Sequence, residues 1–539
     1  MVQNSPTASF PSANAALDAS RAARAAGRFE EELAAAQAAA ELAPDRSDAW
    51  VAVAAAAGRA RKPDLIEPAQ LRALETAADP LLKARLGVDL AWTLSSNGRW
   101  AEAAALARQP RPELANEPAV RAILGATLAA VGAGDEAVPH LEFAARAMPN
   151  RADYWFNLAV VYNSLGRNDE AVAAAEQAIR AAPNHAPAYE LVGLLQKATP
   201  ERNQAQRLQA VRARMPAGPA AAKIDFALFK QLDELGRTAE AWQALSRANQ
   251  TMSQEVRWSA VEDEGLGAAM AAAFPVTATK ADPAGRPRPI FILGLPRTGT
   301  TLVERVFAAH SKVKPLGELV ALGRAVRRGA KAEGGPYMDV RVARAAAEMD
   351  WNAVGREYRQ EVAGLSGEAE VVTDKMPPNW WYAGAIAAAL PDAVMVHVRR
   401  NPMDALFGAY KMTFGPVFDW SYSFENLAAH YRIYRRLTDH WRATLGEAWV
   451  ELDYETLVRD PAAVVPALLE ACGLPFEEAC LHPHLTAGSV STPSAAQVRE
   501  PVTSGRIGAW RRYEAQLEPL RALLEADGFV GPNGDTSVG

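Results

Sequence analysis

Three glycines in the first third of the chain are evenly spaced, so that Gly98, Gly132 and Gly166 each lie 34 residues apart. Two prolines, Pro149 and Pro183, keep the same interval. Glycine readily ends a helix, and a proline just beyond a helix stops it. A fixed period of this length predicts a unit of two helices that is copied along the chain. Each copy stacks on its neighbours, because a single copy cannot bury its own apolar face.

The copy at residues 154–184, YWFNLAVVYNSLGRNDEAVAAAEQAIRAAPN, shows this unit best. Its two helices, on either side of Gly166, line one face with apolar or small residues: Leu158, Ala159, Tyr162, Ala171, Ala175 and Ala178. The copy resembles the tetratricopeptide repeat, and looser copies occupy residues 25–44 and 232–245. We therefore expect an all-α solenoid of such repeats over residues 14–255. The resemblance implies that its curved surface holds a peptide or a partner protein.

The pattern changes after residue 255. Residues 275–289, PVTATKADPAGRPRP, are rich in proline and polar residues, and we expect a linker over residues 256–287. Beyond it, short runs rich in β-branched residues alternate with helical patterns. These runs lie at residues 290–293, 371–372, 393–398 and 449–452. Such alternation predicts an α/β domain with a mainly parallel sheet, here over residues 288–525.

The loop after the first of these strands has the form of an anion-binding turn. The segment FILGLPRTGTT, residues 291–301, runs from a strand into a helix with one apolar face. Backbone N–H groups at the start of such a helix attract an anion. Loops that bind ATP carry a lysine after their second glycine, where this chain has Thr300. The basic residue here is Arg297 at the loop apex, and the missing lysine argues against an ATP-dependent kinase.

The stretch LPRTGTT resembles the 5′-phosphosulfate loop of sulfotransferases, above all their tyrosylprotein and bacterial repeat-containing branches, which read P-R-[ST]-G-T-T. The resemblance implies a P-loop-like sulfotransferase domain. The donor of this family is 3′-phosphoadenosine 5′-phosphosulfate (PAPS), and by resemblance the loop residues bind it. These residues are Pro296, Arg297, Thr298, Gly299, Thr300 and Thr301.

A second segment, VHVRRNPMDALFGAY at residues 396–410, resembles the family's 3′-phosphate signature. Arg400 takes the place of the arginine in that signature. The family usually has a serine eight residues further on, where this chain has Gly408. One hydroxyl contact to the 3′-phosphate is therefore missing, and Lys411 could substitute for it.

Two later segments extend the resemblance to residues 288–515. ELDYETLVRDP matches the family's Y-E-x-L-V-x-x-P segment, which implies that Tyr454 lies near the nucleotide. STPSAAQVREPVTSGRIGAWRRY resembles the family's C-terminal segment, and the resemblance assigns Ser494 and Arg506 to the nucleotide as well. The four motifs occur in the family's order, which makes them more specific together than any one alone.

Sulfonate transfer to a hydroxyl needs a base for the acceptor proton and fixed cations near the oxygen that leaves with the nucleotide. By resemblance, Arg297 and Lys375 in VVTDKMPPNWWY supply the charge. Glu318 in HSKVKPLGE is our candidate base, since a carboxylate suits a phenol when its site raises the pKa. Glu318 could instead cap a helix that begins at Leu319, and His310 is the rival base.

Composition limits the remaining classes of function. The chain has 539 residues, which suggests two or three domains, and a net charge of −6 that gives no overall basic field for nucleic acid. The two cysteines, Cys472 and Cys480, are expected to be unreactive thiols in a reducing cytoplasm. We expect no signal peptide and no membrane span, because no basic start precedes an apolar run and no 18-residue apolar run occurs. The histidines show no metal-binding spacing, so we expect no metal.

The resemblance favours a PAPS-dependent sulfotransferase whose acceptor is a tyrosine of a peptide or protein held by the repeats. A polysaccharide or small-molecule hydroxyl is the alternative acceptor. A non-catalytic repeat scaffold with a degenerate transferase domain is the alternative function, and Gly408 is the feature that favours it. The aromatic residues of WWYAG, 380–384, either line an acceptor pocket or belong to the core. The sequence does not indicate the oligomeric state.

Overall fold

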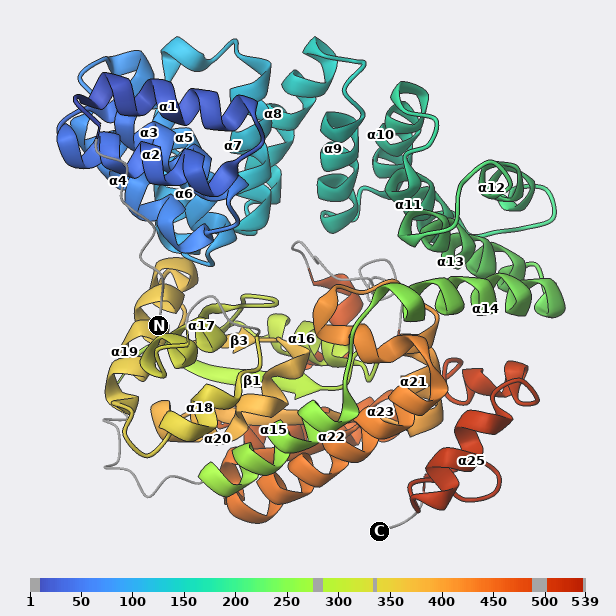
Figure 1. Cartoon of the computed structure of the whole chain (residues 1–539). Helices are drawn as coiled ribbons and strands as arrows, with labels where there is room; N and C mark the ends of the chain where they lie inside the picture. The colour runs from blue at the N-terminus through green and yellow to red at the C-terminus, as the bar shows by residue number, and fades with distance from the viewer. Residues whose placement is uncertain (1–9, 275–284, 333–336, 487–501, 537–539) are drawn as a thin grey trace. The chain divides into compact units, whose positions relative to one another are not determined.

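The computed structural model describes residues 10–274, 285–332, 337–486 and 502–536 (Figure 1). The chain separates into two compact units, Met1–Met148 and Pro149–Gly539. The first unit is helical in its described part, and its core is built largely from alanines such as Ala36, Ala39 and Ala56. Its α-helices are α1 (Ala13–Ala25), α2 (Phe29–Leu42), α3 (Ser47–Arg59), α4 (Ile66–Thr76), α5 (Pro80–Ser96), α6 (Trp100–Ala107), α7 (Pro118–Ala130) and α8 (Gly134–Ala147). Short 3₁₀ turns η1 (Pro63–Leu65) and η2 (Pro112–Leu114) lie between them.

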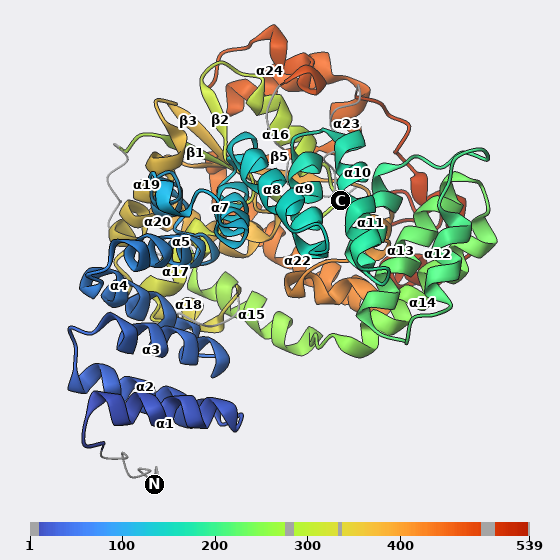
Figure 2. The same cartoon turned by 90° about the horizontal axis from the view of Figure 1, so that it is seen from above.

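The second unit continues the helical pairs before its sheet begins, and Figure 2 shows them following one another from α9 to α14. They are α9 (Ala152–Ser164), α10 (Asn168–Ala181), α11 (Ala186–Leu195), α12 (Ala205–Arg212), α13 (Pro219–Glu234) and α14 (Thr238–Glu255). The apolar positions expected from the best repeat copy are buried in α9 and α10, from Leu158 to Ala178.

The periodic glycines end the first helix of each pair. Gly98, Gly132 and Gly166 have φ values of 74°, 80° and 79°, a left-handed conformation that glycine adopts without cost. In each case the next residue donates its N–H back across the turn, as Arg167 N does to Tyr162 O at 2.9 Å. This Schellman arrangement satisfies carbonyls that the helix end would leave unpaired. The predicted link between the period and the turn is confirmed.

A five-stranded sheet forms the centre of the second unit, in the order β2-β3-β1-β4-β5, and all its pairings are parallel. The strands are β1 (Arg288–Gly294), β2 (Val313–Pro315), β3 (Val371–Asp374), β4 (Val394–Arg399) and β5 (Trp449–Asp453). Four of them coincide with the predicted runs. The sequence did not reveal β2, because a three-residue strand containing Lys314 and Pro315 has no apolar pattern. The predicted fold class, a helical repeat array with a parallel α/β domain, is confirmed.

Helices cover this sheet on both of its faces (Figure 1). The α-helices are α16 (Thr300–Ala308), α17 (Ala321–Gly329), α18 (Val340–Ala345), α19 (Trp351–Ser366), α20 (Ala383–Ala389), α21 (Pro402–Tyr410), α22 (Phe424–Thr444), α23 (Tyr454–Arg459), α24 (Pro461–Ala471) and α25 (Glu518–Ala526). The 3₁₀ turns are η3 (Pro377–Tyr382), η4 (Pro416–Tyr422), η5 (Gly446–Ala448), η6 (Glu478–Leu481), η7 (Pro483–Leu485) and η9 (Ala509–Tyr513). One core cluster joins Ile290 and Ile292 of β1 to Phe307 of α16 and Val396 of β4.

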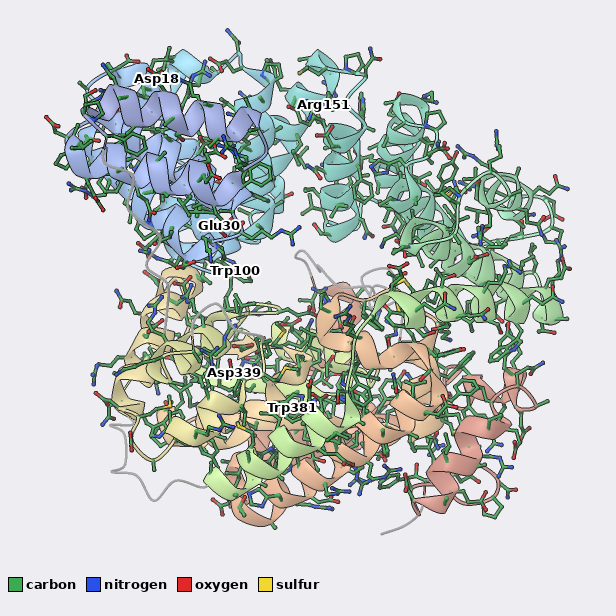
Figure 3. The ribbon with its side chains drawn as sticks, viewed as in Figure 1. Asp18, Glu30, Trp100, Arg151, Asp339 and Trp381 are labelled. Atoms are coloured by element: carbon green, nitrogen blue, oxygen red, sulfur yellow. The ribbon has the colours of Figure 1, made fainter. Side chains whose placement is uncertain are left out.

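The aromatic run after β3 belongs to the core. Trp380 and Trp381 are each 1% exposed, and their rings stack with centroids 4.4 Å apart. Trp381, labelled in Figure 3, lies among the helices of the α/β domain. Trp441 Nε1 donates a hydrogen bond to Trp380 O at 2.8 Å. These indoles therefore do not line an acceptor pocket, which was one of the two interpretations of this run.

The linker predicted at residues 256–287 contains a helix, α15 (Ala260–Ala273), so the prediction was wrong over that part. Leu266, Met270 and Phe274 are buried at intervals of four residues, and α15 packs against α18 and α22. Phe274 O accepts a hydrogen bond from His440 Nε2 at 2.9 Å. The helical stripe was hard to recognise because alanine and glycine fill most positions between these residues.

The α/β domain also extends past the predicted end at residue 525. Gly534 O accepts a hydrogen bond from Asn401 Nδ2 at 2.9 Å.

Within the described ranges, no helix is both long enough and apolar enough to cross a membrane. Both cysteines are buried free thiols, and burial raises the pKa of Cys472 to about 12 and that of Cys480 to about 11. Thiols with such high pKa values are poor nucleophiles near neutral pH.

Candidate functional site

The carboxyl ends of the five parallel strands meet at one edge of the sheet, which is where open α/β sheets bind ligands. Five of the segments predicted to carry the site leave the sheet at this edge. The anion-binding loop follows β1, Glu318 follows β2, Lys375 follows β3, Arg400 follows β4 and Tyr454 follows β5. The topology thus gathers residues that lie far apart in the sequence.

The loop between β1 and α16 is held in an unusual backbone conformation. Arg297 has φ 70° and Gly299 has φ 106°, and both values are in the left-handed region. A Cβ added at Gly299 would lie only 2.4 Å from Tyr454 Cδ2, so the tyrosine ring covers the loop where the glycine leaves room. Gly299 is also the N-cap of α16, and a glycine has no side chain with which to cap the first amides of this helix. The start of α16 is therefore arranged to receive an anion.

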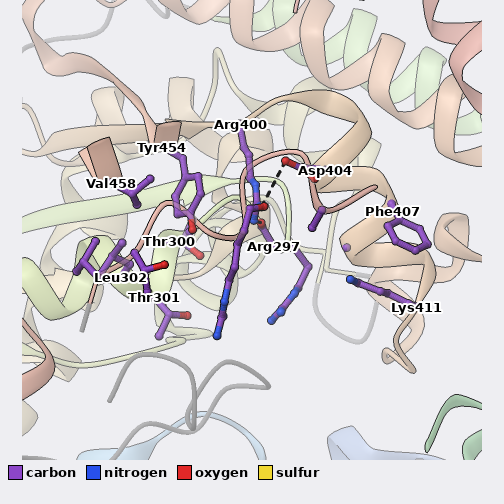
Figure 4. A pocket seen from close by; sticks show the side chains of 16 residues that line it. Arg297, Thr300, Thr301, Leu302, Arg400, Asp404, Phe407, Lys411, Tyr454 and Val458 are labelled. Atoms are coloured by element: carbon purple, nitrogen blue, oxygen red, sulfur yellow. Dashed lines mark hydrogen bonds and ion pairs between the residues drawn. The ribbon is translucent and has the colours of Figure 1, made fainter. Parts of the chain in front are cut away.

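A cavity of about 350 Å³ lies against this loop (Figure 4). Arg297, Arg400, Lys411 and Arg506 bring four cationic side chains to its wall. Asp404 is the one carboxylate among the described residues that line it. Figure 4 shows Lys411, which directly follows α21, beside Phe407. The rest of the described lining is neutral: Gly299, Thr300, Thr301, Leu302, Phe407, Gly408, Tyr454, Val458, Val502, Thr503 and Ala509.

Arg400 ties two walls of the cavity together. Its Nη1 donates to Arg297 O at 3.0 Å, and its Nη2 donates to Arg506 O at 2.7 Å. The guanidinium also stacks on Tyr454, with its carbon 4.5 Å from the ring centroid. Its Nε is buried and has no hydrogen-bond partner within the described residues. An anion in the cavity would give this group an acceptor.

Asp404 holds the C-terminal segment against the cavity. Its carboxylate accepts hydrogen bonds from Gly508 N at 2.7 Å and from Trp510 N at 3.2 Å. It also lies 3.6 Å from Arg400 Nη2, the ion pair drawn in Figure 4. Asp404 belongs to the N-P-x-D motif, which could have pointed to it, although it was not among the predicted site residues.

Burial and the neighbouring positive charges lower the pKa values of two basic residues in the cavity. Burial, together with the neighbouring Arg400 and Arg506, lowers the pKa of Arg297 to about 10. Burial and the charges of Arg297 and Arg400 lower the pKa of Lys411 to about 8. Burial is the larger cause of both shifts, and repulsion between the neighbouring cations adds to it. An anionic ligand would relieve this repulsion.

Not every predicted donor-binding residue reaches the cavity. Arg297, Gly299, Thr300 and Thr301 line it, together with Arg400, Tyr454 and Arg506. Pro296 is absent from the described lining. Thr298 is also absent, because its buried hydroxyl donates inward to Leu295 O at 2.8 Å. Ser494 lies outside the described residues.

Gly408 has a structural explanation in this chain. A Cβ at position 408 would lie 2.9 Å from Arg297 Cβ, so the side chain of Arg297 occupies the space that a serine would need. Lys411, one turn further along, lines the same cavity and packs its ammonium 4.6 Å from the Phe407 ring. The chain thus has a lysine near the position where the family's serine is missing.

Lys375 and Glu318 form a pair, and neither is among the described residues that line this cavity. Lys375 is fully buried, and its Nζ donates a 2.5 Å hydrogen bond to Glu318 Oε1, whose side chain is 40% exposed. Lys375 N also donates to Gly317 O at 2.8 Å. Helix α17 begins at Ala321 without a side-chain cap, so the suggestion that Glu318 caps a helix at Leu319 was wrong. Glu318 is therefore free of that structural role and open to solvent.

Glu304 of α16 supports the turn that carries Glu318, and the sequence analysis missed it. Glu304 Oε1 accepts a hydrogen bond from Gly317 N at 3.0 Å. Burial, and beyond it the charge of Glu318, raises the pKa of Glu304 against the opposing effect of Lys375. Burial likewise raises the pKa of Asp374 well above its usual range. A glutamate inside a short helix, here between Val303 and Arg305, gives no sequence signal for such a role.

His310, the rival base, is a structural residue. It is 2% exposed at the end of α16 remote from the loop. Its Nε2 lies 2.9 Å from Pro475 O, and its Nδ1 accepts a hydrogen bond from Lys312 N at 3.1 Å. A ring held at both nitrogens is poorly placed to take a proton from a substrate. Among the described residues, no group of histidine, cysteine or carboxylate side chains is arranged to hold a metal ion.

Comparison with known proteins finds similarity in both parts of the chain. Residues 289–478 match the sulfotransferase family, and residues 128–198 match the tetratricopeptide repeat. An uncharacterized protein of Aquifex aeolicus (strain VF5) is 31% identical over 330 residues, which cover 57% of this chain. The match covers 42% of that relative, so the chain spans less than half the length of the curated relative it matches.

Solved structures show likeness at low identity. The sulfotransferase domain from the Synechococcus PCC 7002 olefin synthase is 19% identical, with a TM-score of 0.32, over 48% of this chain and 100% of its own. The sulfotransferase domain from the curacin biosynthetic pathway is 16% identical, with a TM-score of 0.28, over 44% of this chain and 99% of its own. YrrB, described as a tetratricopeptide-repeat protein with an unusual peptide-binding site, is 20% identical, with a TM-score of 0.29. That match covers 33% of this chain and 89% of YrrB.

Proposed function

We propose that this chain, which joins a sulfotransferase domain to tetratricopeptide repeats, transfers the sulfonate of PAPS to a hydroxyl acceptor. The observation that carries the proposal is the cavity at the sheet edge, where four cations face a single carboxylate among the described lining residues. Such a site needs a polyanionic ligand. PAPS carries a phosphosulfate on the 5′ position of its ribose and a phosphate on the 3′ position. Cations that come from several elements can contact both groups at once.

The residues present fit this donor. The start of α16 and Arg297 would hold the 5′-phosphosulfate, as anions bind at helix N-termini. Arg400, Arg506 and Lys411 would hold the 3′-phosphate, and the buried Nε of Arg400 would gain its missing acceptor. The bound donor supplies an activated sulfonate. Because Thr300 stands where ATP-binding loops have a lysine, the loop is less suited to a triphosphate.

We assign the proton transfer to Glu318 and charge stabilisation to Arg297 and Lys375. Glu318 is solvent-accessible at the sheet edge, and its Oε1 already holds the Lys375 ammonium at 2.5 Å. In this role a carboxylate oxygen of Glu318 takes the acceptor's proton. The two cations offset the negative charge that develops on the leaving oxygen.

The acceptor we favour is a tyrosine of a peptide or protein held by the repeats, as in the tyrosylprotein branch that the loop resembles. The match of residues 128–198 to a repeat that binds proteins supports this choice. A polysaccharide or small-molecule hydroxyl is the alternative. Gly408 was the feature that favoured a non-catalytic scaffold. The packing of Arg297 against position 408 accounts for this glycine, so the scaffold has less support. Two buried free thiols agree with a cytoplasmic location, which is part of the proposal.

Calorimetry with adenosine 3′,5′-bisphosphate tests the donor site. We expect the full chain to bind this nucleotide more tightly than ATP, and Arg400→Ala to bind it at least about tenfold more weakly. Arg356→Ala is the control, because that guanidinium is 71% exposed on α19 and outside the cavity lining. Absence of binding at millimolar nucleotide, or tighter binding of ATP, would contradict the proposal.

Transfer itself is tested by incubating the full chain with labelled PAPS and a cell lysate, followed by mass spectrometry of the labelled products. Sulfotyrosine in peptides would support the favoured acceptor. Label on a glycan or a small molecule would establish the alternative acceptor class. Bisphosphate binding without any labelled product in lysates from several sources would favour the scaffold.

A further inference from the structure

The last repeat helices of the second unit pack directly on the wall of the nucleotide cavity. Phe229 of α13 lies with its ring centroid 6.5 Å from that of Phe407 and 5.8 Å from that of Tyr513. Trp242 of α14 stacks on Tyr410 at 6.2 Å and lies 5.7 Å from Tyr513. The helix that carries Gly408 and leads into Lys411 is thus packed against the repeats.

A buried polar contact fixes the register of this packing. Asn249 of α14 is 1% exposed, and its Nδ2 donates to Tyr410 O at the end of α21 at 3.0 Å. That carbonyl belongs to the residue before Lys411. A buried hydrogen bond of this kind is costly to break, so α21 and α14 are expected to move together.

Asp233 at the end of α13 connects the repeats to the C-terminal segment. Its Oδ1 accepts hydrogen bonds from Arg512 Nη1 and from the Tyr513 hydroxyl, each at 2.8 Å. These two residues end η9, and Asp404 holds the beginning of the same segment. The stretch from Arg506 to Tyr513 is therefore fixed at one end by the α/β domain and at the other by a repeat helix.

Asp233 also acts on the charge of the cavity. The charged groups that face Lys411 are Arg297, Arg400, Asp233 and Asp404. The two arginines, with burial as the larger cause, lower the pKa of Lys411, whereas Asp233 and Asp404 oppose this effect. Asp404 lies on α21, the helix that Lys411 directly follows, but Asp233 comes from the repeat array. The array thus supplies part of the charge balance of the site.

We propose that the last repeat pair is a working part of the nucleotide site and that Asp233 is its positioning residue. Asp233 holds the segment that carries Arg506 and keeps Lys411 protonated for the nucleotide's phosphate. The inference rests on the proposed function, since it concerns the same cavity and the same class of ligand. It gives the repeats a second role besides holding a partner.

The test is the pH dependence of adenosine 3′,5′-bisphosphate binding, measured by calorimetry on the full chain between about pH 6.5 and 9.5. A bound phosphate favours protonated Lys411, so wild-type affinity should be constant below about pH 8 and fall above it. In Asp233→Asn the amide keeps a hydrogen-bond acceptor but loses the charge. The fall in affinity should then begin at a lower pH than in the wild type, because Asp233 no longer raises the pKa of Lys411.

Three variants make the outcome specific. Asp225→Asn, also on α13, removes a buried carboxylate that pairs with Arg212 and Arg247, and it should change stability without moving the pH midpoint. Arg512→Ala removes one hydrogen bond to Asp233 but leaves the charge of Asp233. This variant should therefore bind the bisphosphate more weakly, without lowering the pH at which its affinity falls. Lys411→Ala should abolish the fall above pH 8.

The possible failures are distinguishable. If the wild-type chain binds no bisphosphate, the proposed function fails. If the wild type binds but Asp233→Asn has the wild-type profile, the function stands and this inference is overturned. A uniform loss of affinity at every pH would also overturn it, because that result would show a purely structural role for Asp233.

Discussion

At the residue scale, the side chain of Arg297 packs against the backbone of Gly408 and requires a glycine at that position. Arg297 has a positive φ, and its Cβ would lie 2.9 Å from a Cβ at position 408, which leaves no room for a side chain there. We predict that Gly408→Ser, which restores the family's usual residue, weakens adenosine 3′,5′-bisphosphate binding by about tenfold, since overpacking displaces Arg297. Calorimetry measures the change.

Gly415→Ser is the control for this substitution, because a Cβ at Gly415 meets nothing within 4 Å and its φ of −77° suits any residue. Its affinity should equal that of the wild type. Tighter binding by Gly408→Ser would show that Arg297 can move aside. It would also show that the missing serine is a real deficit.

Glu318 is predicted to act in the transfer step and not in donor binding. Glu318→Gln should reduce transfer of labelled sulfonate by about 10²- to 10⁴-fold, because the amide cannot take the acceptor's proton. Bisphosphate affinity should change by less than about twofold, since Glu318 is outside the described cavity lining. Equal transfer by the variant and the wild type would remove the base assignment.

Glu304 is predicted to position Glu318 through the Gly317 amide. Burial raises the pKa of Glu304, and Glu304→Gln should keep both the shape of the side chain and the oxygen that accepts from Gly317 N. Glu304→Ala removes the acceptor and should lower the transfer rate by about 10- to 100-fold with nucleotide affinity unchanged. Failure of glutamine to restore activity would argue against a positioning role.

The sequence predicted these residues unevenly. Arg297, Arg400 and Tyr454 could be recognised because each sits in a motif that directly follows a strand. Arg506 could be recognised from the motif of the C-terminal segment. Glu304 could not, since a carboxylate inside an amphipathic helix is usually solvent-exposed. Its partner amide lies in a turn whose path depends on tertiary packing. Motifs reveal strand ends well, whereas they reveal contacts between a helix and a distant turn poorly.

At the scale of elements, the repeat turns depend on left-handed glycines. We predict that Gly166→Ala destabilises the second unit by about 1–2 kcal/mol, because its φ of 79° strains any residue with a Cβ. Chemical denaturation followed by circular dichroism measures the loss. Gly265→Ala is the control. It lies inside α15 with open space around its Cα and should be neutral or stabilising. Equal stability of both variants would contradict the turn's role.

Elements with a strong pattern could be predicted, and those without one could not. Four strands are short β-branched runs between helices, and the sequence located them. The fifth, β2, contains Lys314 and Pro315 and is defined only by its pairing with β3. Helix α15 is an alanine-rich stretch that resembles neither the repeats nor a strand. Its existence depends on the surface of α22, which the local sequence cannot show.

At the scale of the whole molecule, the boundary between compact units does not coincide with the boundary between families. The units meet between Met148 and Pro149, inside the helical array, whereas the matched sulfotransferase region begins at residue 289. The 34-residue period runs across this point without a change in composition, so no sequence pattern marks it. The later repeats are consequently grouped with the α/β domain in one unit.

This grouping predicts how nucleotide binding spreads through the second unit. Hydrogen exchange on the full chain, with and without saturating adenosine 3′,5′-bisphosphate, should show added protection at α21 and η9. Protection should also increase at the ends of α13 and α14, because Asp233 and Asn249 join these helices to the cavity wall. Asn249→Ala should uncouple α14 while the protection of α16 persists. If added protection in the wild type were confined to residues 288–536, nucleotide binding would not stabilise the repeat helices. The contacts between the repeats and the α/β domain would then not couple the two.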